Sequence, residues 1–233
     1  MKKRNVILLL LCCSLLMACE NSLKRKFRNA QSLAKSKKAE DWEKAVEKYE
    51  EIVQMKVEAR ENQGLLYRKL GKYHFNLDHF NDALAYYQKA VAILPVSGEI
   101  HYRLAICYSQ LSRTTTDEAQ KMELTRKAEE EYKVALGFSP EILECYYGLG
   151  VIYFWVYKDY YKGIGYMAEV LKRDPKNVDA HFALARFYYE LGEPGKSLEF
   201  YKALLSLLKD RDPRHEQVKD NIQRILREMQ ENM

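Results

Sequence analysis

Residues 64–95 read GLLYRKLGKYHFNLDHFNDALAYYQKAVAILP, and this stretch decides the fold. Its first half carries large residues, Leu, a small residue and His at three- and four-residue intervals, which places them on one face of a helix. Its second half has the same spacing around two Ala residues and ends in Pro, which cannot continue a helix. The stretch therefore predicts two helices that pack as a hairpin. The positions that carry the pattern are Tyr67, Leu70, Gly71, His74, Ala83, Tyr87, Ala90 and Pro95.

The same order of residues returns three more times, with a period of about 34 residues. The second copy has His101, Leu104, Ala105, Tyr108, Ala128, Tyr132, Ala135 and Pro140. The third has Tyr146, Leu149, Gly150, Tyr153, Gly163, Met167, Val170 and Pro175, and the fourth has His181, Leu184, Ala185, Tyr188, Ser197, Tyr201 and Leu204. Copies in phase at such a period are typical of stacked helical hairpins, in which each unit buries its apolar face against its neighbours.

The pattern resembles the tetratricopeptide repeat (TPR), whose consensus has an aromatic, Leu, Gly and Tyr in a first helix and Ala and Phe in a second helix closed by Pro. The resemblance implies an all-α fold, a right-handed α-solenoid of about five helix-turn-helix repeats with a C-terminal capping helix. Small residues such as Gly71 and Gly150 are expected to let the paired helix approach closely. Only 10 Gly and 5 Pro occur in 233 residues, which also favours helices over an all-β fold.

The predicted boundaries follow the Pro residues and the changes in composition. We expect a signal peptide over 1–18, a basic linker over 19–26, a degenerate repeat over 27–60, full repeats over 64–97, 98–142, 143–177 and 178–211, and a capping helix over 214–231. The second repeat is longer than the others, because 23 residues separate Ala105 from Ala128 where 12 separate Gly71 from Ala83. The extra residues predict either an extended second helix with a longer loop or a protruding recognition element. Thr116 or Asp117 could cap a helix there.

The first residues resemble an export signal. Lys2, Lys3 and Arg4 precede a short apolar run that ends at Met17 and is too short to span a bilayer comfortably. Leu16-Met17-Ala18-Cys19 is similar to the lipobox of bacterial lipoproteins, in the relaxed form familiar in spirochaetes, because Met replaces the Ala, Ser, Thr or aliphatic residue usual at its second place. The resemblance implies cleavage before Cys19, a diacylglyceryl group on its thiol, and an acyl chain such as palmitate on the new amino end.

Two alternatives stay open for this segment, an ordinary secretory signal and an uncleaved helical anchor. If Cys19 is lipidated, the protein is a membrane-anchored lipoprotein that faces the periplasm or the cell exterior. Glu20 follows the Cys, and the lack of Asp there favours the outer membrane over the inner membrane. Seven basic residues between Asn21 and Ala39 could contact anionic headgroups, or could form a solvated helix face.

The net charge argues against a nucleic-acid partner. It falls from +5 to +2 when Lys2, Lys3 and Arg4 leave with the signal peptide, and nucleic acids require a concentrated basic surface. In TPR proteins the first helices line a concave groove that holds a protein partner, and the resemblance implies the same here. The candidate groove residues are Arg68, Phe75, Tyr102, Tyr147, Phe154, Phe182, Arg186 and Tyr189. Their aromatic character favours an amphipathic helix or an extended peptide as partner, although the rings could instead pack between repeats.

No catalytic motif, phosphate-binding loop or metal-ligand spacing stands out, so we expect neither catalysis, nor a metal, nor a cofactor beyond the lipid on Cys19. Cys107 and Cys145 fall on adjacent first helices, where they could pair or serve as small core residues. The sequence therefore predicts a membrane-anchored TPR scaffold or adaptor in an envelope assembly. The alternatives are a binder of a small apolar ligand or lipid within the helical array and an accessory subunit of a transport system.

Overall fold

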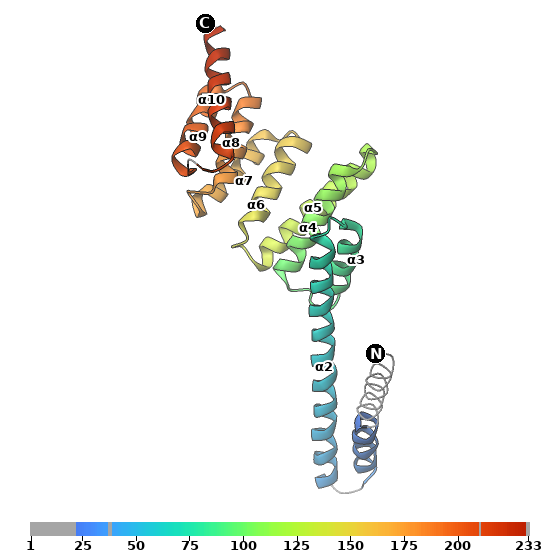
Figure 1. Cartoon of the computed structure of the whole chain (residues 1–233). Helices are drawn as coiled ribbons and strands as arrows, with labels where there is room; N and C mark the ends of the chain where they lie inside the picture. Colours follow the sequence, from blue (N-terminus) through green and yellow to red (C-terminus); the bar gives the residue numbers. More distant parts are fainter. Residues whose placement is uncertain (1–21, 37–38, 210, 232–233) are drawn as a thin grey trace, which may run out of the picture. The chain divides into compact units, whose positions relative to one another are not determined.

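The computed structural model describes residues 22–36, 39–209 and 211–231, and in these ranges every regular element is a helix (Figure 1). This confirms the predicted all-α fold. The expected signal peptide and Cys19 lie outside the described residues. The chain forms two compact units, Met1–Leu66 and Tyr67–Met233. Within the described residues, no helix is both long enough and apolar enough to cross a membrane.

The first unit contains a helical hairpin. Residues 22–34 form one helix, and α2 (Ala39–Phe75) begins after the following turn. The Phe27 ring contacts the Tyr49 ring edge-on at a centroid distance of 5.9 Å, and Lys26 forms an ion pair with Glu51 at 2.8 Å. Ala30, Ala45 and Ile52 are buried. These contacts join two helices, as expected for the degenerate repeat, but the first helix begins at residue 22, inside the linker predicted over 19–26.

The expected break between residues 60 and 64 is absent, because α2 runs on to Phe75 without interruption. The other hairpins are separated by Pro95, Pro140, Pro175 and Pro213, whereas residues 53–66 contain no Pro and only one Gly. Nothing in this stretch prevents the backbone hydrogen bonds of the helix from continuing. The first helix of the first full repeat is therefore the C-terminal part of α2.

The second unit is a series of antiparallel hairpins. Its remaining elements are α3 (Phe80–Val91), α4 (Gly98–Thr114), α5 (Glu118–Phe138), α6 (Leu143–Val151), the π-helix η1 (Ile152–Val156), α7 (Tyr160–Arg173), α8 (Val178–Glu190), α9 (Pro194–Leu207) and α10 (Arg214–Glu231). α10 buries Val218 and Ile225 against a cluster that includes Leu204, so it covers the apolar end of the last hairpin.

Small residues allow the close helix contacts that the sequence predicts. A Cβ atom on Gly71 would lie 2.8 Å from the Tyr87 ring, and one on Gly150 would lie 3.1 Å from the backbone oxygen of Gly163. Three of the turns inside hairpins contain a residue with positive φ, namely Asp78, Lys158 and Gly192. The helices therefore contact each other where the side chains are smallest, and the chain reverses in tight turns.

The long second repeat is built from two extended helices. α4 has 17 residues and α5 has 21, and only residues 115–117 join them. Asp117 caps α5 by accepting hydrogen bonds from the backbone N–H groups of Ala119 and Gln120. The expected extension of the second helix is present, whereas the expected longer loop is wrong, because the extra residues lengthen both helices. Their joined ends form a helical tip, made up of residues 109–125.

Cys107 and Cys145 are free and fully buried. Burial raises the pKa of each thiol to about 12, because a thiolate loses its hydration in the core. These side chains serve as small core residues between adjacent hairpins, and the raised pKa makes them poor nucleophiles.

Candidate functional site

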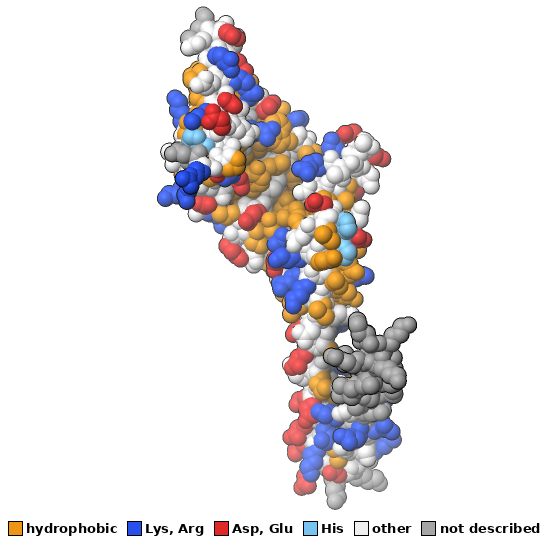
Figure 2. All heavy atoms as spheres, viewed as in Figure 1, with side chains coloured by type: hydrophobic (Ala, Val, Ile, Leu, Met, Phe, Trp, Pro, Cys, Tyr) orange, Lys and Arg blue, Asp and Glu red, His pale blue; other side chains and the backbone are white. Residues whose placement is uncertain are grey.

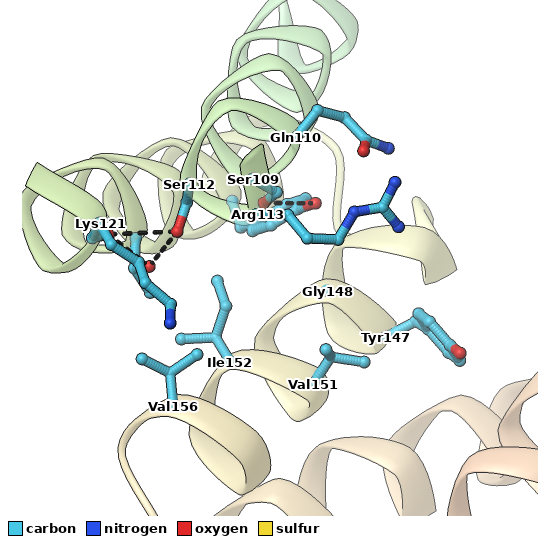
Figure 3. Close-up of a pocket in the computed structure, with 12 residues that line it drawn as sticks. Ser109, Gln110, Ser112, Arg113, Lys121, Tyr147, Gly148, Val151, Ile152 and Val156 are labelled. Atoms are coloured by element: carbon cyan, nitrogen blue, oxygen red, sulfur yellow. Dashed lines mark hydrogen bonds between the residues drawn. The ribbon is translucent and has the colours of Figure 1, made fainter. Parts of the chain in front are cut away.

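A pocket of about 370 Å³ lies between the helical tip of α4 and α5 and the α6–η1 segment (Figure 3). Figure 3 shows Ser112, Arg113 and Lys121 on one side of the pocket, with side chains of α6 and η1 facing them. The lining residues are Ser109, Gln110, Ser112, Arg113, Lys121, Thr125, Tyr132, Tyr147, Gly148, Val151, Ile152 and Val156. The pocket exists because α4 and α5 extend beyond the length of the other hairpins.

The pocket floor is apolar. Val151, Ile152 and Val156 contribute it from successive turns of α6 and η1. The Thr125 hydroxyl donates a hydrogen bond to the Lys121 carbonyl at 2.8 Å and lies 2.7 Å from the Ser112 hydroxyl. These polar groups on the opposite wall therefore satisfy one another. An apolar ligand group can enter without leaving them unpaired.

Two cations flank this apolar floor. Lys121 forms an ion pair with Glu118 at 3.2 Å, so its charge is partly balanced. Arg113 is exposed and forms no ion pair with any residue in the described ranges. A guanidinium beside an apolar pocket presents a planar set of donors that suits a carboxylate.

The π-helix shapes the neighbouring part of the surface. The Tyr157 N–H donates to the Ile152 carbonyl at 3.2 Å, which is the wide-turn hydrogen bond of a π-helix. A second, smaller pocket of about 70 Å³ follows, and it is lined by Tyr147, Val151, Trp155, Phe182, Ala183, Arg186 and Phe187. The Arg186 guanidinium lies 5.6 Å from the Trp155 ring centroid. Tyr147 and Val151 line both pockets, so the two form one groove from the tip of α4 to α8.

This groove lies in an apolar region of the surface. Figure 2 shows hydrophobic side chains gathered over α6, between α8 and the helical tip. Burial raises the pKa of Tyr147 further above neutral pH, and its protonated phenol can donate a hydrogen bond. The groove therefore offers apolar contact area, the phenol of Tyr147 and the cations of Arg113 and Arg186.

Three of the eight predicted groove residues, Tyr147, Phe182 and Arg186, line the groove. Others are engaged within the fold. Arg68 forms an ion pair with Glu99 at 2.8 Å, the Phe75 ring packs edge-on against Phe80 at 5.5 Å, and the Tyr102 ring lies 6.5 Å from Tyr132. The Tyr189 hydroxyl donates to Glu228 of α10 at 2.9 Å. The structure does not bring Arg68, Phe75 and Tyr102 together with the groove. Tyr189 lines a neighbouring pocket of about 310 Å³ with Phe182 and Arg186.

The prediction for Phe154 is wrong. Its ring is fully buried and stacks on Phe187 with 3.7 Å between ring centroids, so it cannot contact a partner. Trp155 lines the groove instead, and it is absent from the residues predicted from the sequence. Arg113 and Val156 are absent from that prediction too. Arg113 lies in the extra length of the second repeat. This insertion is the sequence feature that points to Arg113 as a site residue.

Comparison with known proteins identifies the repeat. Two models of the tetratricopeptide repeat match the chain, over residues 68–121 and 158–222. The chain is a TPR protein. No curated protein sequence matches it.

Solved structures share the fold of this TPR protein. A thermophilic TPR protein of Thermus thermophilus is 17% identical, with a TM-score of 0.59 over 88% of this chain and 98% of that chain. PilF of Pseudomonas aeruginosa is 19% identical, with a TM-score of 0.57 over 74% and 72% of the two chains. YrrB, a TPR protein with an unusual peptide-binding site, is 16% identical, with a TM-score of 0.55 over 76% and 83%. At these identities the likeness shows the fold alone.

Proposed function

We propose that this TPR protein is a lipid-anchored scaffold in a cell-envelope assembly, and that it holds a protein partner in the groove between α4 and α8 without catalysing a reaction. The observation that carries the proposal is the pocket at the helical tip, where an apolar floor lies beside the exposed guanidinium of Arg113. Scaffolds of stacked repeats bind through such extended surfaces. The peptide-binding site of the structural neighbour YrrB supports a peptide as occupant.

The chemistry of the groove favours a particular kind of peptide. The apolar floor would bury one aliphatic or aromatic side chain, worth about 1.5–3 kcal/mol. Arg113 and Arg186 at the two pockets would each bind a carboxylate, so acidic residues are expected on either side of that apolar anchor. We therefore expect an apolar anchor flanked by Asp or Glu, in an extended segment or on one face of a helix.

Photo-crosslinking tests the position of the partner. A benzophenone amino acid at Val156 should crosslink to a protein in native membranes, because this side chain lines the pocket. The same probe at Lys202, which is exposed on α9, is the matched control. Equal crosslinking from both positions, or none from Val156, would show that the groove does not hold the partner.

Charge reversal tests the role of Arg113. The Arg113→Glu variant should reduce the yield of the Val156 crosslink at least tenfold, since loss of a charge-assisted pair and the new repulsion together amount to about 1.4 kcal/mol or more. Lys202→Glu makes the same change of charge on α9 and should leave the yield within twofold. Circular dichroism should show unchanged helicity in both variants, because both side chains are exposed. A yield that Arg113→Glu leaves unchanged would exclude an acidic partner at this pocket.

The lipid anchor rests on the sequence around Cys19. Two acyl chains or more give stable membrane anchoring, whereas one gives only marginal binding. Cells fed a labelled fatty acid should therefore incorporate label into the wild-type protein and none into Cys19→Ser, and the variant should move from the membrane to the soluble fraction. Equal labelling of the two proteins would refute lipidation at this residue.

A small apolar ligand or lipid is the second candidate occupant. The 370 Å³ pocket falls within the volume range of about 300–1,000 Å³ that is usual for small-molecule sites. Such a binder would also suit an accessory subunit of a transport system. Native mass spectrometry of the purified protein separates the candidates, because a retained small molecule that Val156→Asp removes would favour the ligand over the peptide.

A further inference from the structure

We propose that His74, His79 and Asp82 form a binding site for a divalent transition metal ion, with Zn²⁺ as the best match. One ligand atom from each of the three side chains lies within 4.8 Å of the other two. The site is separate from the groove and does not depend on the proposed function. Figure 2 shows histidine side chains on the surface beside α3.

The turn between α2 and α3 gathers these side chains. His74 lies in the last turn of α2, His79 immediately precedes α3, and Asp82 lies in the first turn of α3. The His79 N–H donates to the His74 carbonyl at 3.0 Å, and Asp78 between them has a φ of 58°. Few residues adopt this left-handed conformation, and Asp is among those that do. The backbone thereby holds the two histidines next to each other.

His74 is held in place with one ring nitrogen unused. Its Nδ1 atom is buried and has no hydrogen-bond partner among the described residues. Its ring is fixed by a stacked contact with Tyr86, with 5.2 Å between ring centroids. A buried polar atom without a partner is costly, and a metal ion bound at Nδ1 would remove that cost. The neutral imidazole nitrogen is a common metal ligand.

The distances between the candidate ligand atoms are close to those of a metal site. The His74 Nδ1 atom lies 3.7 Å from the nearer Asp82 carboxylate oxygen. Metal–ligand bonds of about 2.0–2.2 Å in a tetrahedral site place ligand atoms roughly 3.4 Å apart. His79 and Asp82 are exposed, so small rotations of these two side chains can close the remaining distance while His74 stays in place.

The donor set selects the metal. Two imidazole nitrogens and one carboxylate oxygen suit Zn²⁺ and its first-row neighbours, whereas Mg²⁺ and Ca²⁺ prefer oxygen ligands throughout. Three protein ligands leave a fourth tetrahedral position for water. A metal ion here would also link α2 to α3 across their turn, and so would stabilise the first full repeat.

Titration calorimetry with zinc chloride tests the proposal on the full-length protein, purified in detergent without a histidine tag. We expect one equivalent of Zn²⁺ to bind and to raise the thermal unfolding temperature. His79→Ala and Asp82→Asn should each weaken binding by more than about tenfold, because loss of a residue that merely supports a metal ligand already costs that much. Both side chains are exposed, so both variants should keep the helicity of the wild type.

His215→Ala is the control, because His215 lies near the start of α10, outside the cluster. It should leave the zinc affinity unchanged. The absence of saturable zinc binding by the wild type would overturn the proposal. So would binding that His79→Ala and Asp82→Asn leave intact, since the metal would then lie elsewhere.

Discussion

Replacement of Phe187 by Ala should lower the free energy of unfolding by about 3–5 kcal/mol, which is the usual cost of removing a large buried ring. Phe187 on α8 is 1% exposed and stacks on the fully buried Phe154 of η1, with 3.7 Å between centroids and 3° between ring planes. Trp155 contacts the same ring edge-on at 5.9 Å. The substitution would remove these ring contacts together and leave a cavity.

The destabilisation by Phe187→Ala should be confined to one interface, because repeat proteins are stabilised by contacts between neighbouring repeats. Phe154 and Phe187 join the third hairpin to the fourth. We therefore expect α8, α9 and α10 to unfold at lower denaturant concentration than α3 to α7, so that one transition becomes two. Urea titration followed by circular dichroism and amide hydrogen exchange would show both effects.

Phe138→Ala is the matched control for this prediction. This side chain is 48% exposed at the end of α5, and its ring stacks on His101 at 5.7 Å. The free energy of unfolding should fall by less than about 1 kcal/mol, with a single transition. Equal losses in the two variants would show that the Phe154–Phe187 stack does not couple the hairpins.

The repeat pattern predicts the core well, for a physical reason. Spacing of three and four residues fixes which face of a helix is apolar, and that face must be buried. Tyr87, Leu104, Leu149 and Leu204 are all almost fully buried, as their place in the pattern predicts, whereas Leu70 in the first full repeat is 40% exposed. The continuity of α2 could not be predicted as directly, because it depends on the lack of a helix-breaking residue between two repeats.

The groove is harder to predict, because it depends on departures from regular helix geometry. Helical periodicity places Phe154 on the groove face. The wide turn of η1 takes up an additional residue, so Phe154 is buried and Trp155 lines the groove instead. No sequence signal marks this change. The pocket beside Arg113 depends in turn on the length of α4 and α5. The insertion indicates extra length in this repeat, but not whether the extra residues form a loop or extend both helices.

The candidate metal ligands escape prediction from the sequence for a similar reason. His74 and His79 are five residues apart, a spacing that does not place two side chains on one helix face. They come together only because the chain leaves α2 and reverses at Asp78 before α3 begins. A search confined to helical spacing cannot find ligands that a turn brings together.

Replacement of Gly163 by Ala should destabilise the protein by about 2 kcal/mol, although Ala is the better helix former by about 1 kcal/mol. A Cβ atom at this position would lie 2.7 Å from the Phe154 Cβ and 2.9 Å from the Phe154 backbone nitrogen. Because part of this contact is with backbone, no rotation of a side chain can relieve it. The equivalent places in the other repeats hold Ala83, Ala128 and Ser197, each with a Cβ atom. The π-helix in the third repeat is therefore what makes Gly necessary here.

Gly165 provides the control within the same helix. It is exposed on α7, and a Cβ atom built there meets nothing within 4 Å. Gly165→Ala should raise the free energy of unfolding by about 1 kcal/mol, through the helix propensity of Ala alone. The two Gly→Ala substitutions should thus have opposite signs in urea denaturation, although they are two residues apart. If both stabilised the protein, the backbone of η1 would have room to move away from α7, and the groove built on η1 would lose its rigid support.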